Sequence, residues 1–98
     1  MAQIIWTEPA QTSLDAIADY IALDNPVAAR ELVRKISNAV KQLARFPRSG
    51  SRIPEASHRA ARQLIIKPCR IFYRSKGQTI FILHVMRQEQ LFRREFIG

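Results

Sequence analysis

The sequence is poor in the residues that build cofactor sites and cross-links. It contains one cysteine, two histidines and three glycines. The lone Cys69 cannot form a disulfide within the chain, the glycines form no phosphate-binding loop, and His58 and His84 have no neighbouring metal ligand. No apolar run approaches the roughly 18 residues of a membrane span, and the N-terminus does not resemble a signal peptide. We therefore expect a cytoplasmic protein without a metal ion or cofactor.

Negative charge is also scarce, and it is unevenly distributed. The 8 acidic residues face 16 Lys and Arg, which gives a formal net charge of +8. Residues 1–24 contain four acidic residues and no Lys or Arg, so every basic residue lies in residues 25–98. Such an imbalance favours a polyanionic partner, either a nucleic acid or an acidic protein segment. The alternative is a solvated basic surface that keeps the protein soluble.

The hydrophobic spacing predicts a single α+β domain over residues 1–98, because a chain of this length holds one core. Asn25 and Pro26 mark the start of a second helix immediately after the first, and so short a connection makes the two helices an antiparallel hairpin. The expected strands and helices are a strand at 3–6, helices at 8–23 and 26–46, and strands at 61–66, 70–75 and 79–86. The N-terminal strand and the hairpin would pack with one face of a small, mostly antiparallel sheet.

The last two strands predict a second face of the sheet that the helices cannot cover. Alternation places large apolar and basic side chains there. A turn at Lys76-Gly77 would set Phe72 opposite Phe81 and Arg70 opposite Leu83. The expected members of this face are Gln63, Ile65, Arg70, Phe72, Arg74, Phe81, Leu83 and Val85. An apolar groove with a basic rim would be a docking surface for another molecule.

The C-terminal sequence QLFRREFIG offers an alternative. Its apolar residues Leu91, Phe92, Phe96 and Ile97 suit the role of a cover. If this segment folds back over the second face, the chain closes that face itself and no external partner is needed there.

Candidate chemistry is confined to arginines. His84 is more often a buried histidine than a general base, and no Ser-His-acid set or carboxylate pair stands out. Arg52 and Arg59 precede the sheet, Arg62 and Arg70 lie on neighbouring strands, and Arg87 ends the last strand. Guanidinium groups of this kind could hold phosphates or the carboxylates of a partner peptide. Cleavage of RNA would also need a group that accepts the 2′-hydroxyl proton near neutral pH.

In order and spacing, the sequence resembles the RelE/ParE toxin superfamily, and in detail a ParE-type toxin. The segments that carry the resemblance are WTEPA at 6–10, LDAIADYIALDNPVAA at 14–29, FPRSGSRIPE at 46–55, RQL at 62–64, CRIFYR at 69–74 and ILHVMRQEQLF at 82–92. They span almost the whole chain. The resemblance implies a toxin that poisons DNA gyrase and a ParD-like antitoxin whose C-terminal segment wraps the helical hairpin and the sheet.

RelE-type relatives instead cut messenger RNA in the ribosome. The resemblance therefore also implies which positions should carry the residues that cleavage needs. Arg70 matches the central-strand arginine of those nucleases. Their lysines correspond here to Ala61 and Gln63, and their terminal tyrosine to Phe92, which has no hydroxyl group. Without those groups the rate of cleavage should fall roughly 10²-fold to 10⁴-fold. A gyrase inhibitor is therefore predicted, with a ribosome-dependent endoribonuclease as the alternative and a plain nucleic-acid-binding module as a third class.

These inferences lead to two sets of candidate residues and to no catalytic one. The expected target-binding residues are Arg70, Arg87, Arg93 and Arg94. The expected antitoxin-binding residues are Arg34, Lys41, Arg45, Phe72, Phe81 and Leu83.

Overall fold

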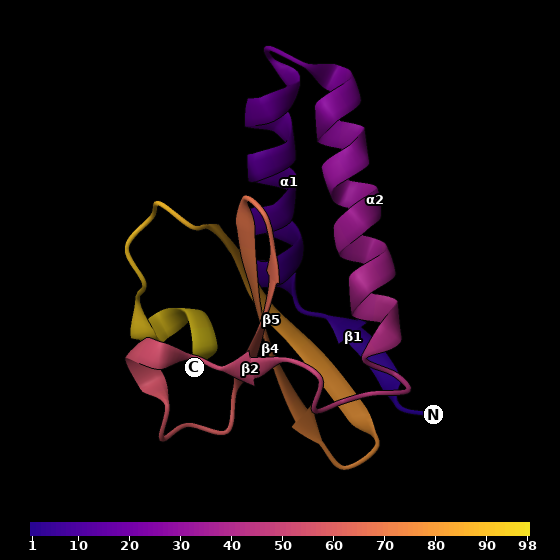
Figure 1. The fold of residues 1–98 in the computed structure, drawn as a ribbon, viewed down its shortest axis with the longest axis vertical. Coiled ribbons are helices and arrows are strands. Elements are labelled where there is room, and N and C mark those ends of the chain that lie inside the picture. The colour runs from indigo at the N-terminus through magenta and orange to yellow at the C-terminus, as the bar shows by residue number, and fades with distance from the viewer.

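Two helices pack against one face of a mixed five-stranded sheet in the computed structural model, which describes residues 1–98 (Figure 1). The elements are β1 (Gln3–Trp6), α1 (Glu8–Ala22), α2 (Pro26–Gln42), β2 (Ser51–Arg52), the 3₁₀ helix η1 (Pro54–Ala56), β3 (Arg62–Ile66), β4 (Cys69–Lys76), β5 (Thr79–Arg87) and the 3₁₀ helix η2 (Arg94–Ile97). The strand order is β1-β5-β4-β3-β2, with β1 parallel to β5 and the other neighbours antiparallel. The predicted fold class is confirmed. Neither α1 nor α2 has the length and hydropathy needed to cross a membrane.

Both helices begin at the signals in the sequence. The Thr7 hydroxyl accepts a hydrogen bond from the Ala10 N–H at 3.3 Å, and Asn25 Oδ1 accepts one from the Ala28 N–H at 3.0 Å. Pro26 follows in the first turn of α2, where its missing N–H is not needed. The helices and the sheet enclose the main core, made of Ala10, Leu14, Ile17, Leu32, Ile36, Val40, Leu43, Cys69, Ile71, Tyr73, Ile80, Ile82 and Val85.

The pairing between β4 and β5 differs from the prediction. The turn residues are Gly77 and Gln78, because Lys76 pairs with Thr79, and Gly77 supplies the positive φ of 59°. The register shifts again between Phe72 and Tyr73, which pair with His84 and Ile82. The bulge leaves Leu83 as an extra residue on β5.

The shifted register corrects several predicted positions. Phe72 lies opposite His84 rather than Phe81, and Arg70 lies opposite Met86 rather than Leu83. The bulge also reverses which side of β5 faces the helices. As a result Val85 belongs to the main core, while Met86 points to the second face.

The second face of the sheet is not bare, so the predicted open groove is wrong and the alternative of an internal cover is confirmed. The C-terminal segment, residues 88–98, crosses to the side of the sheet opposite the helices, where η2 contacts β4 and β5 (Figure 1). A second core forms beneath it from Ile53, Ala56, Ala61, Phe72, Met86 and Ile97, with Leu83, Phe92 and Phe96 packed at its edge.

Two arginines hold this segment in place. Arg74 Nη2 donates to the Ile97 carbonyl oxygen at 3.0 Å, and Arg59 Nη2 donates to the main-chain oxygen of Gly98 at 2.7 Å. The ring of Phe96 stacks on His84 with the centroids 3.8 Å apart. Apolar contacts and hydrogen bonds together hold the C-terminal segment on the second face of the sheet.

Candidate functional site

Arg70 is enclosed on the second face by residues from three parts of the chain. Its Nη2 and Nη1 donate to the two carboxylate oxygens of Glu55 at 2.7 and 2.9 Å, and its Nε donates to Gln63 Oε1 at 2.9 Å. The guanidinium carbon lies 5.0 Å from the Phe72 ring centroid and 5.8 Å from that of Phe92. Only 11% of its side chain is exposed, so the predicted target-binding arginine is already neutralised and nearly buried.

The same pair sets the protonation of Glu55. The hydrogen bonds from the Arg70 guanidinium hold the pKa of the Glu55 carboxyl below its ordinary value of 4.5, although partial burial opposes this. The carboxylate is therefore charged at neutral pH and stays bound to Arg70 in a two-point, charge-assisted contact.

Glu55 is the one acid or base bonded to Arg70, and both of its carboxylate oxygens are taken up by the guanidinium group. Of the three residues that the resemblance aligned with nucleolytic lysines and tyrosine, Gln63 and Phe92 touch Arg70, and neither can accept a proton near neutral pH. His84 stacks on Phe96, and burial lowers the pKa of its imidazole. Burial raises the pKa of the Cys69 thiol to about 11, so this cysteine is no nucleophile at neutral pH.

The other predicted target-binding arginines do not join Arg70. Arg87 Nε lies 3.3 Å from Glu89 Oε1, and its guanidinium carbon lies 4.9 Å from the centroid of the Tyr20 ring of α1, on the helix side of the sheet. Arg93 lies 3.3 Å from Glu95, with both side chains largely exposed. Arg94 is exposed at the start of η2 and forms no ion pair. The sheet therefore separates Arg70 from Arg87.

The predicted antitoxin-binding residues fall on two different surfaces. Arg34 and Lys41 line a groove of about 780 Å³ between α1 and α2, which we call the hairpin groove. Arg45 is exposed beyond the end of α2. Phe72 is fully buried under the C-terminal segment, and Phe81 and Leu83 on the second face are half-buried. The exposure expected for Phe72 is thus contradicted.

Sequence reasoning missed the apolar side chains at the free end of the helical hairpin. Tyr20, Leu23 and Val27 are 62%, 86% and 59% exposed there. Their positions fall outside the three-and-four spacing of the buried faces, and this exception was the available signal. The hairpin tip projects beyond the sheet (Figure 1), while the Tyr20 ring packs against Arg87 of β5.

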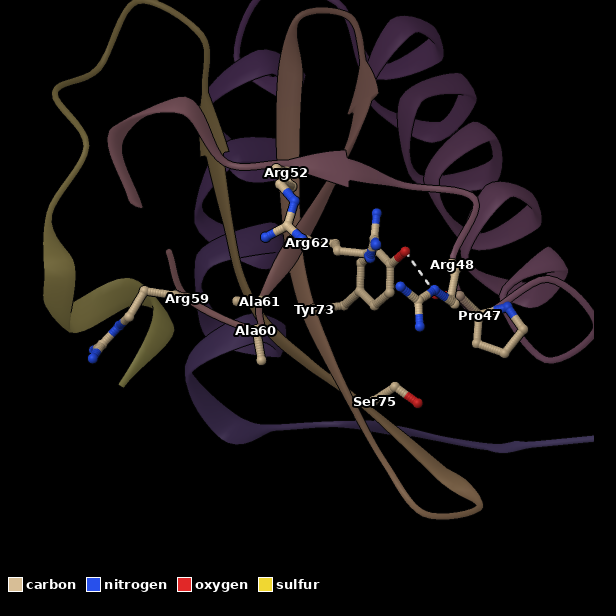
Figure 2. Close-up of a pocket in the computed structure, with 9 residues that line it drawn as sticks. All are labelled: Pro47, Arg48, Arg52, Arg59, Ala60, Ala61, Arg62, Tyr73 and Ser75. Atoms are coloured by element: carbon tan, nitrogen blue, oxygen red, sulfur yellow. Dashed lines mark hydrogen bonds between the residues drawn. The ribbon is translucent and has the colours of Figure 1, made fainter. Parts of the chain in front are cut away.

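Three of the arginines named as possible phosphate ligands, Arg52, Arg59 and Arg62, line a basic hollow at the edge of the sheet, between the 47–50 turn and the ends of β3 and β4. It has a volume of about 430 Å³ and is lined by Pro47, Arg48, Arg52, Arg59, Ala60, Ala61, Arg62, Tyr73 and Ser75 (Figure 2). The arginines come from two loops and two strands, β2 and β3, and only Arg62 lies opposite Tyr73 in the sheet. The sequence analysis grouped three of them with Arg70 and Arg87, which lie elsewhere, and it missed Arg48.

Comparison with known proteins agrees with the fold. The family model for the ParE toxin of the type II toxin-antitoxin system parDE matches residues 4–92. The chain is 33% identical to Toxin RelE2 of Caulobacter vibrioides, over 89% of this chain and 92% of that protein. It is 38% identical to the putative toxin Y4kP of Sinorhizobium fredii, over 90% of each. A solved structure from the chromosomal ParDE system of P. aeruginosa superposes with a TM-score of 0.74 at 30% identity, covering 91% of this chain and 98% of that one.

Proposed function

The chain belongs to the ParE toxin family of type II toxin-antitoxin systems, and from that membership we propose that it arrests bacterial growth by binding DNA gyrase and is neutralised by a ParD-like antitoxin. Both partners would be met in the cytoplasm. The family model that matches the chain is named for a parDE pair, and the solved relative comes from a ParDE system. A toxin of this kind needs no cofactor, because it acts by occupying its target.

The observation that carries the proposal is the environment of Arg70. A nuclease that uses this arginine needs it free to face a phosphate, with an acid or base that is free to exchange a proton with the substrate. Here Glu55 occupies two of its nitrogens, Gln63 a third, and aromatic rings cover it. This arrangement favours action by binding over RNA cleavage.

A ribosome-dependent endoribonuclease is the second candidate, because a relative with 33% identity carries the name RelE2. It requires that Glu55 release Arg70 and that some group such as His84 take the proton. The two candidates differ in what they inhibit, so paired assays distinguish them.

The test is a supercoiling assay with purified gyrase beside primer extension on translated messages. We expect gyrase to be inhibited and the messages to stay intact. The variant Arg87→Ala/Arg93→Ala should lose inhibition, whereas Lys35→Ala/Lys67→Ala, which removes the same charge from exposed sites, should retain it. Cut messages with unaffected supercoiling would overturn the proposal. Full inhibition of gyrase by the Arg87→Ala/Arg93→Ala variant would exclude these two arginines from the gyrase-binding surface.

For neutralisation we propose the hairpin groove. Its lining combines small apolar residues with three basic residues and one acidic residue, Asp19; the apolar and basic members include Ala18, Ala22, Ala29, Val33, Arg30, Arg34 and Lys41. An amphipathic acidic segment would match both properties, by burying apolar side chains in the groove and pairing carboxylates at the rim. Arg45 would lie near the end of such a contact on α2. Phe81 and Leu83 lie on the second face of the sheet and would be reached only by an antitoxin segment that continues around the sheet, and Phe72 only after the C-terminal segment moves.

Charge reversal tests this surface. Arg34→Glu/Lys41→Glu should weaken capture by the antitoxin at least tenfold in a titration, whereas Lys35→Glu/Lys67→Glu should change it much less. Equal losses in the two variants would indicate long-range charge attraction and would contradict a specific groove.

A further inference from the structure

We propose that the basic hollow binds the phosphodiester backbone of a nucleic acid, at a site distinct from the Arg70 cluster. This goes beyond the proposed function, because the binding requires neither gyrase nor an antitoxin. Three observations support it: unpaired charge, partly fixed guanidinium groups, and a lining rich in arginine without Asn, Gln or an exposed aromatic ring.

The arginines of the chain divide into those with a carboxylate partner and those without. The ion-paired group consists of Arg34, Arg70, Arg87 and Arg93. By contrast, Arg48, Arg52 and Arg62 form no ion pair with Asp or Glu, and no acidic residue lines the hollow that they share. Three like charges around one concave surface repel one another, so an anion bound there lowers the electrostatic energy.

Two of these guanidinium groups are held by the backbone. Arg62 Nη1 donates to the Gly50 carbonyl oxygen at 2.8 Å, and Arg52 Nη1 donates to the Ser57 carbonyl oxygen at 2.9 Å. Each group has five N–H donors, so the remaining donors of both are open to a ligand. Because the side chains are already partly immobilised, binding loses less conformational entropy.

Tyr73 shapes the hollow without taking part in binding. Its hydroxyl donates to the Pro47 carbonyl oxygen at 2.8 Å and accepts from the Gly50 N–H at 2.9 Å. These two bonds pin the turn that carries Arg48 beside the sheet. Arg59 also lines the hollow, but Figure 2 shows its guanidinium group turned away, where it donates to Gly98.

The lining favours a backbone over a base or a free nucleotide. It contains no Asn or Gln, the side chains that most often read adenine edges, and its only aromatic residue, Tyr73, is buried. A site for a single nucleotide would be expected to enclose the base between apolar or aromatic walls. Arginines directed at phosphates supply affinity without sequence preference.

The test is fluorescence anisotropy with the purified chain and a labelled 20-nucleotide DNA, used as a single strand and as a duplex, at several salt concentrations. Arg48→Gln/Arg52→Gln removes two exposed arginines of the hollow, and Lys35→Gln/Lys67→Gln removes two exposed charges elsewhere. Thermal unfolding checks that both variants fold. We expect the hollow variant to weaken binding at least tenfold for any base sequence, and the control to change it less than threefold.

Salt dependence gives a second readout. The slope of log affinity against log salt on duplex DNA should become shallower by about 1.8 in the hollow variant, since each phosphate contact contributes roughly 0.9. Equal effects of the two variants on affinity and slope would overturn the proposal in favour of diffuse attraction by net charge. Tight binding of ATP without binding of either oligonucleotide would overturn it as well, because the ligand would then be a free nucleotide.

Discussion

Replacement of Phe72 by alanine tests whether the C-terminal segment covers the second face in solution. Phe72 is fully buried, with its ring edge-on to Phe92 at 5.4 Å and stacked near Phe96 at 6.5 Å between centroids. Truncation of a buried Phe costs about 3–5 kcal/mol, and each aromatic pair contributes about 0.5–1.5 kcal/mol beyond its area. We therefore expect the free energy of unfolding to fall by about 4–5 kcal/mol, near the upper end of the range for a buried Phe.

That loss is large beside the total stability of a domain of this size, about 5–15 kcal/mol. Urea unfolding followed by circular dichroism measures it. With a slope of about 1.5 kcal/mol per molar urea, the midpoint should fall by roughly 3 M. The matched control is Phe46→Ala, whose side chain is 57% exposed and whose loss should stay below about 1 kcal/mol.

A double-mutant cycle separates docking of the segment from burial in general. Phe72→Ala and Phe96→Ala should be non-additive by about 0.5–1.5 kcal/mol, because their rings contact each other. Equal costs for Phe72→Ala and Phe46→Ala, or strict additivity in the cycle, would refute the reasoning and leave the second face open.

Two further predictions concern Glu55 and Gly50. The folded-state pKa of Glu55 lies below 4.5, so its pairing with Arg70 stabilises the fold fully above that pH and is lost as the pH falls through the lowered value. The stability difference between the natural chain and Glu55→Gln, from urea midpoints, should therefore shrink from pH 7 to pH 3, and a constant difference would contradict the pairing. At Gly50, an added Cβ would lie 2.6 Å from the Gln63 carbonyl oxygen and from the Tyr73 hydroxyl oxygen. Gly50→Ala should lower the thermal midpoint by several degrees, and an unchanged midpoint would show that the turn yields.

Local signals in the sequence were enough for the fold class, both helices and four of the five strands, but they missed β2 (Ser51–Arg52) and placed the end of the second helix at 46 rather than at Gln42. Thr7 and the Asn25-Pro26 pair act through residues three positions away, and they locate both helix starts. Helical periodicity gave α1 to within one residue, since the predicted helix 8–23 is observed as Glu8–Ala22. These features depend on neighbours in the chain, so a single sequence contains them.

Features that depend on distant residues were harder to predict. The β4–β5 register depends on whether the turn falls on Gly77-Gln78 or one residue earlier, and the bulge at Leu83 has no local signal. The enclosure of Arg70 requires Glu55, 15 positions away in a loop with no predicted structure. The unpaired charges of the basic hollow could be identified only after the carboxylates had been assigned to other arginines.

The bulge in β5 has a consequence for the chain length that this fold tolerates. Before it, Ile80 and Ile82 face the helices, and after it Val85 does, so the two halves of the strand are out of phase by one residue. Deletion of Leu83 would bring them into a single alternation and keep the interior side chains on their own sides. Removal of His84 would do the same, but removal of a residue elsewhere in the strand would turn part of it inside out, so length variation among natural relatives should concentrate at these two positions.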